Sequence, residues 1–185
     1  KNLDPKEIKN KFLLKIFQQE QNRALKTKPY KSNSTKSKLG SNPLILNMPV
    51  DEELISSLYK IKARDQEKYQ APTYGNAKGS DYQLFERNDS SIRKVKEQLI
   101  RIIRDSVQSD VFISESFFTI FRSGGGLISH NHLSRLDKIK ELNIAQKKFS
   151  LVYYLSVGDQ ECNEPGILKM ENPNQNILPN NGLII

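Results

Sequence analysis

The sequence contains two histidines, and both lie in the stretch SGGGLISHNH at residues 123–132. Side chains alternate along a β-strand, so His130 and His132 would point to the same face, about 6.6 Å apart at ~3.3 Å per residue. Imidazoles at that spacing can lean together onto one metal ion. A histidine pair with further open positions suits iron(II) or another first-row metal. The alternative is two hydrogen-bonded histidines on a polar strand.

Helices and strands must position this pair. Glycines 124–126 predict a tight turn that brings the histidine strand back against the FFTIF strand. Asp51 would cap one helix, and Ser90 or Asp89 would cap another over residues 90–108. Later in the chain the apolar period changes to two or to continuous runs, which predicts strands at 114–123, 126–133, 148–157, 166–171 and 182–185. Helices followed by strands indicate an α+β domain.

The positive charge of the chain is confined to its N-terminal part. Residues 1–40 hold eleven Lys or Arg and three Asp or Glu, whereas residues 41–185 hold 18 of each kind. A groove for nucleic acid needs its basic excess on the folded body, so we do not expect nucleic-acid binding. We predict a basic helix over residues 1–26, a linker over 27–41 and the folded domain over 42–185. The helix could end an upstream helical array or contact a partner.

Other features narrow the class of protein. No apolar run approaches the ~20 residues of a membrane span, and nothing resembles a signal peptide. Cys162 is the single cysteine and cannot form an internal disulfide, which favours a reducing compartment. We therefore expect a cytoplasmic protein without a membrane partner. The chain begins at Lys1 rather than Met and ends on an apolar run, so we expect both ends to be cuts through a longer protein.

The surroundings of the histidines resemble a known enzyme class. The run FFTIFRSGGGLISHNH, followed by SLVYYLSVGDQ, EPGILKMENP and ILPNNGLII, is similar to the iron(II)- and 2-oxoglutarate-dependent oxygenases. The closest similarity is to a prolyl-hydroxylase-like group with a glycine turn, H-x-H, a V-Y-Y strand and a G-x-L-x-x-x-x-P strand. The resemblance covers residues 42–185. It implies a double-stranded β-helix, a jelly-roll or cupin-like barrel, backed by the N-terminal helices.

The resemblance also implies roles for particular residues. His130 would be the first metal ligand, and His132 takes the place where most relatives have Asp or Glu. The site would then use three histidines, or two histidines with water in the remaining place. Tyr154 would reach the 2-oxoglutarate carboxylate, unless it is a core tyrosine, and Leu168 would pack beside the cosubstrate. The distal histidine and the basic cosubstrate anchor would follow Ile185, so we expect the 185 residues alone to be inactive.

The implied activity is a dioxygenase that uses iron(II), 2-oxoglutarate and O2, with ascorbate as reductant, to hydroxylate an unidentified substrate. Two alternatives remain. A non-oxygenase cupin would use His130, His132 and a later acidic ligand, for which Asp137 is the nearest candidate. An inactive β-helix binding module would keep the barrel without the metal. The stretch at 133–148 could be a lid over the site or a packed connection.

Overall fold

The computed structural model describes residues 42–69, 74–133, 137–138, 147–158, 161 and 166–185. The predicted basic helix at 1–26 and the linker at 27–41 lie outside these residues, as does most of the 133–148 stretch. The chain divides into two compact units. Among the described residues, 96–114 belong to one unit, and those in the ranges 42–95 and 115–185 belong to the other. All the candidate site residues belong to the second unit.

The two longer helices begin where their capping residues predict. Helix α2, Glu52–Lys60, follows Asp51, whose side chain accepts a hydrogen bond from the backbone N–H of Glu53 at 3.0 Å. Helix α4, Ser90–Val107, follows Asp89, whose carboxylate accepts from the backbone N–H groups of the next turn at 3.0 and 3.1 Å. Each acidic side chain satisfies amide donors that the helix cannot pair internally. The predicted helix starts are therefore confirmed.

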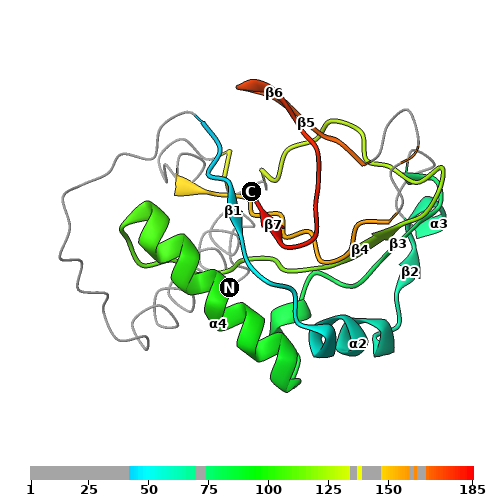
Figure 1. Ribbon diagram of the computed structural model, residues 1–185, viewed down its shortest axis with the longest axis horizontal. Coiled ribbons are helices and arrows are strands. Elements are labelled where there is room, and N and C mark those ends of the chain that lie inside the picture. Colours follow the sequence, from blue (N-terminus) through cyan, green and yellow to red (C-terminus); the bar gives the residue numbers. More distant parts are fainter. Residues whose placement is uncertain (1–41, 70–73, 134–136, 139–146, 159–160, 162–165) are drawn as a thin grey trace, which may run out of the picture. The chain divides into compact units, whose positions relative to one another are not determined.

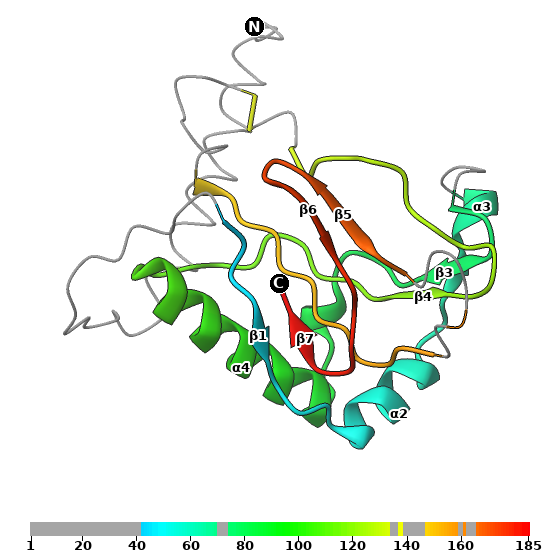
Figure 2. The ribbon, with the colours of Figure 1, turned by 45° about the horizontal axis from the view of Figure 1, so that its top comes forward.

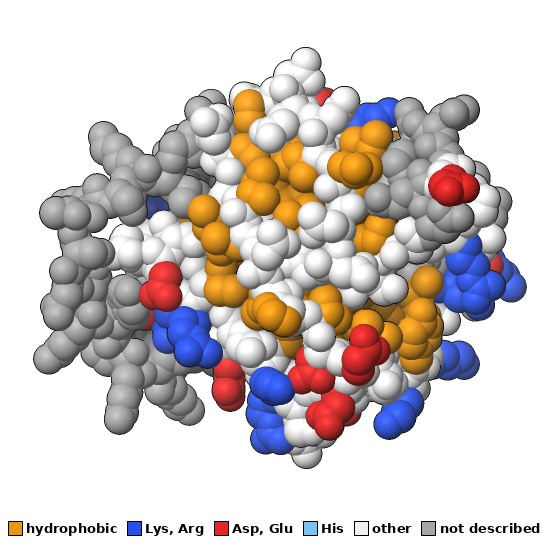
Figure 3. All heavy atoms as spheres, in the orientation of Figure 1, with side chains coloured by type: hydrophobic (Ala, Val, Ile, Leu, Met, Phe, Trp, Pro, Cys, Tyr) orange, Lys and Arg blue, Asp and Glu red, His pale blue; other side chains and the backbone are white. Residues whose placement is uncertain are grey.

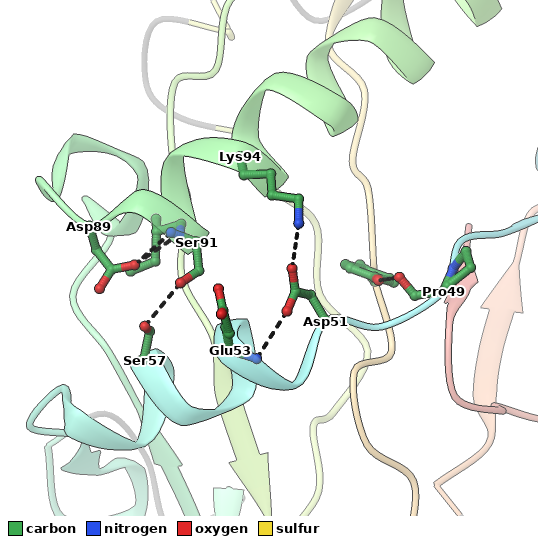
Figure 4. A network of polar contacts seen from close by, with 9 residues as sticks. Pro49, Asp51, Glu53, Ser57, Asp89, Ser91 and Lys94 are labelled. Carbon is green, nitrogen blue, oxygen red and sulfur yellow. Dashed lines mark hydrogen bonds and ion pairs between the residues drawn. The ribbon is translucent and has the colours of Figure 1, made fainter.

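A small polar network links the start of α4 to α2 (Figure 4). The hydroxyls of Ser57 and Ser91 lie 3.2 Å apart, and Lys94 Nζ donates to Asp51 Oδ2 at 2.7 Å. The hydrogen bond from Lys94 lowers the pKa of Asp51. Apolar side chains of both helices are buried around this network: Leu54, Leu58, Ile92 and Val95. Full burial of each such aliphatic side chain favours folding by about 1.5–3 kcal/mol.

The strands form three small antiparallel sheets (Figure 1). The first has the order β2–β3–β4, made of Arg64–Asp65, Ala77–Gly79 and Thr119–Phe121. The second pairs β1, Leu46–Asn47, with β7, Leu183–Ile184, and the third is the hairpin of β5, Leu168–Glu171, with β6, Asn174–Ile177. Helix α3, Gln66–Tyr69, follows β2, and the short 3-10 helix η2, Leu84–Glu86, follows β3.

Strand β7 has a second neighbour on the side away from β1 (Figure 2). Val152 and Ile185 exchange two backbone hydrogen bonds of 2.9 and 3.0 Å, and Tyr154 N–H donates to Leu183 at 2.9 Å. Between these two hydrogen-bonded pairs, Tyr153 and Ile184 form an isolated antiparallel bridge. The middle of the predicted 148–157 strand is therefore paired, and the predicted strands near residues 168 and 183 are present as β5 and β7.

Other strand predictions were wrong. The structure assigns no strand to residues 126–133, because after the bond from Gly126 N–H to Tyr74 at 3.2 Å no ladder continues along this stretch within the described residues. Of the predicted 114–123 strand, only Thr119–Phe121 pairs in a sheet, although Ser116 bridges to Gln83. The strands of the described ranges form no closed barrel, and the double-stranded β-helix stays a prediction.

Candidate metal and ligand pocket

Both histidines line a pocket of about 300 Å³. Asn131 lines it with them, and other parts of its wall come from the segments around β3 and β4. Residues that are distant in sequence therefore meet here: Gln66 from the start of α3, Ser80 after β3, and Thr119 from β4. A concave space with a few polar groups is the usual form of a small-molecule site.

The glycine turn before the histidines is held against the segment that precedes β3. Arg122 N–H donates to Asn76 at 3.1 Å, and Gly125 N–H closes the turn onto Arg122 at 2.8 Å. Gly124 has φ +80, a left-handed conformation that favours glycine. At Gly125 an added Cβ would lie 2.7 Å from the Asn76 carbonyl oxygen. The turn therefore needs glycine for two separate reasons, one conformational and one steric.

The two imidazole rings lie together. Their centroids are 5.0 Å apart and their planes make an angle of 70°. His130 Nδ1 lies 2.8 Å from the carbonyl oxygen of Ile128. Because a carbonyl oxygen only accepts, Nδ1 carries the proton in this contact, and the lone pair of the neutral ring is then on Nε2. Histidine ligands of metals are commonly oriented by such a bond at the other ring nitrogen.

The surroundings of His132 favour its neutral form by lowering its pKa. Partial burial is the main cause that lowers its pKa, and the neighbouring His130 and Lys148 act in the same direction. Glu115 opposes them and lines the same pocket. A neutral imidazole is the form that binds a metal. The sequence analysis missed Glu115, although it lies two residues before Phe117 in the very run that was predicted to pair with the histidine segment.

A third protein ligand is not found among the residues that the structure describes. No group of three His, Cys, Asp or Glu side chains in these ranges is arranged to hold a metal ion. Asp137, the candidate acidic ligand of a cupin, is almost fully buried and accepts a hydrogen bond from Lys148 Nζ at 2.8 Å. That carboxylate is therefore engaged in an ion pair.

The two residues assigned to the cosubstrate do not line the histidine pocket. Tyr154 is half-buried, and burial raises the pKa of its hydroxyl. Leu168, on β5, is half-buried and pairs with Ile177 across the hairpin. The histidine segment does contact this hairpin, because Ser129 Oγ donates to Glu171 Oε1 at 2.6 Å. The structure thus brings the two histidines together but does not add Tyr154 or Leu168 to their pocket.

No family model, curated protein or solved structure matches this chain. The resemblance to the oxygenases therefore stays an interpretation of the residues themselves. Within the described part of the chain, no helix is both long and apolar enough to cross a membrane.

Proposed function

We propose that this chain belongs to an iron(II)- and 2-oxoglutarate-dependent dioxygenase of the cytoplasm, and that His130 and His132 hold its metal. The observation that supports the proposal is the paired arrangement of the two rings, 5.0 Å apart, on the wall of one pocket. The choice of this enzyme class rests on the resemblance of the H-x-H, V-Y-Y and G-x-L motifs of the chain. The double-stranded β-helix remains part of the same proposal.

The donor set fits a first-row metal in part. His130 presents Nε2 as a lone-pair donor because Nδ1 is bonded to Ile128, and the lowered pKa of His132 favours its neutral, donor form. The sequence has no third histidine, so water or a ligand from elsewhere completes the shell. When bound, iron(II) with 2-oxoglutarate and O2 places one oxygen atom in a substrate C–H bond and the other in succinate, with loss of CO2.

The residues of this chain have separate roles in the proposal. The Ile128 carbonyl orients the His130 ring, and the interlocked glycine turn fixes where the segment leaves β4. The pocket holds the substrate beside the two rings. Tyr154 and Leu168 are assigned to 2-oxoglutarate by resemblance alone, and the proposal does not depend on them.

A binding module without a metal is the second candidate. It is favoured by the exposure of both histidines and by the lack of a third ligand in the described ranges. The cupin alternative is weaker, because its acidic ligand would have to leave the ion pair with Lys148. Metal binding distinguishes the first candidate from the second.

Anaerobic titration of the chain with iron(II), followed by 2-oxoglutarate, tests the proposal. We expect a visible charge-transfer band from the chelated cosubstrate. His130→Ala and His132→Ala should each weaken metal binding at least ~10-fold, since even loss of an outer-shell partner costs 10–100-fold. If His132 does not ligate directly, its variant will retain most of the iron.

Asn131→Ala is the matched control. Asn131 lies between the two histidines and also lines the pocket, and its side chain accepts a hydrogen bond from Leu133 N–H at 3.1 Å. This variant should keep the metal affinity of the unchanged chain. Undiminished iron binding by the double variant His130→Ala, His132→Ala would refute the proposed metal site.

A further inference from the structure

Part of the pocket wall is aromatic. Tyr82 and Phe117 line the pocket and pack edge to face, with ring centroids 5.2 Å apart and an interplanar angle of 75°. Their side chains remain 48% and 41% exposed, so the pair presents ring surface to the pocket rather than to a core. Tyr74 adds a third aromatic ring to the lining. Exposed ring faces carry negative potential and attract cations.

The lining also contains one carboxylate. Glu115 is exposed and lies two residues before Phe117. Among the described residues of the pocket wall, it is the one Asp, Glu, Lys or Arg. None of the described side chains forms an ion pair with it. The nearby cation of Lys148 is paired with Asp137 instead. The pocket therefore combines a negative charge with aromatic surface, and no Lys or Arg is found among the described residues that line it.

Two exposed apolar residues lie at or next to this pocket. Leu127 lines the pocket, and Leu127 and Ile128 are 47% and 60% exposed. Elsewhere, the face shown in Figure 3, on which no histidine side chain is visible, carries several hydrophobic patches. A ligand with an apolar stem and a cationic tip would find apolar surface for its stem and a carboxylate for its tip in this lining.

We propose that this pocket binds an ammonium or guanidinium group on an apolar stem, as in the side chains of lysine and arginine. Glu115 pairs with the charge, and Tyr82 and Phe117 pack against the stem and the cation. A volume of about 300 Å³ accommodates one such side chain. In the proposed oxygenase this ligand is the substrate, an assignment that rests on the proposed function, whereas the binding itself does not.

Charge also separates this ligand from the cosubstrate. 2-Oxoglutarate is a dianion, and a like charge at Glu115 repels it. Its carboxylates therefore lie away from the Glu115 wall. The acidic and aromatic part of the wall would hold the substrate, and the cosubstrate would bind away from Glu115.

Calorimetric titration of the metal-free chain tests the inference. The probes are Nα-acetyl-lysinamide and Nα-acetyl-norleucinamide, which share the apolar stem but differ in the charged tip. We expect the lysine probe to bind roughly 5- to 10-fold more tightly, as a half-exposed ion pair combined with cation–π contact allows. Glu115→Gln should remove most of that preference, and Phe117→Leu should weaken the binding of both probes.

Further measurements distinguish a protein substrate from a small amine and test whether charge drives the binding. A short peptide with a central lysine that binds more tightly than the amide identifies a protein substrate, and equal affinity identifies a small amine. Added salt should weaken the binding of the lysine probe alone, which tests the role of charge without any substitution. Equal affinity for both probes, or an unchanged preference in Glu115→Gln, would overturn the inference. Because Glu115→Gln should keep the iron(II) band, the metal site is judged separately.

Discussion

Replacing three successive glycines by alanine tests how the turn before the histidines is held. Gly124 has φ +80 but open space around an added Cβ. Gly125 has no such φ, but its added Cβ would lie 2.7 Å from the Asn76 carbonyl oxygen and 3.1 Å from that of Arg122. At Gly126 no atom lies within 4 Å, and φ is not left-handed. The three variants therefore test separate cases: conformational strain at Gly124, steric overlap at Gly125, and neither effect at Gly126.

The expected losses of stability follow from these geometries. Gly124→Ala should cost about 1–2 kcal/mol, the penalty of a left-handed conformation for an L-residue. Gly125→Ala should cost about 1–3 kcal/mol, because two backbone oxygens must move apart to admit the methyl group. Gly126→Ala should be within about 0.5 kcal/mol of the unchanged chain. Only Gly125→Ala should also separate the turn from Asn76 and Tyr74.

Urea unfolding gives the free energy of unfolding for each variant, and iron(II) titration gives the effect on the histidine pair. We expect Gly125→Ala to lose stability and metal affinity together, because the turn fixes the exit of the histidine segment. Gly124→Ala should lose stability with a smaller change in affinity. A Gly126→Ala variant as unstable as Gly125→Ala would refute the assignment of the turn contacts, since the structure leaves room for that methyl group.

Two further perturbations address the charges near the pocket. Lys148→Met removes an ion-pair partner of the buried Asp137 carboxylate and should lower the free energy of unfolding by about 1–3 kcal/mol. Urea unfolding measures this loss. A much smaller loss would mean that other groups satisfy the carboxylate. The lowered pKa of His132 means that its contribution to stability is present above its ordinary value of 6.5 and is lost as pH falls toward the lower folded value. His130→Ala removes one of the causes and should raise the pKa of His132 in an NMR titration, whereas a further decrease would contradict the proximity of the rings.

The helix starts could be predicted because capping is local. Asp51 and Asp89 each reach amides two or three residues ahead, so the residue types near the start carry the signal. The chain supplies the remaining helix stability through burial of the apolar positions at helical spacing. Tertiary context did not change either outcome.

The small strands could not be predicted for the opposite reason. β3 has the sequence Ala-Lys-Gly and β6 has Asn-Gln-Asn-Ile, and neither shows the alternation or the β-branched content of a strand. β3 forms a strand because β2 and β4 pair with its two edges, and β6 forms because it folds back on β5. Such pairing depends on residues that are distant in sequence or across a turn. Conversely, residues 126–133 have apolar content but no partner in the described ranges that extends the ladder.

The histidine pair was predicted from a strand that is not present, and yet the two rings lie together. The spacing of two residues is therefore sufficient, and the Ile128 carbonyl replaces the sheet in orienting the His130 ring. Glu115 shows what such local reasoning lacks, because it reaches the pocket from a segment fifteen residues before His130. The two proposed metal donors are thus close in sequence, whereas the carboxylate proposed to select the ligand is brought to the pocket by tertiary structure. Substitutions at Glu115 should therefore alter the choice of ligand and leave the metal in place, whereas substitutions at His130 should do the reverse.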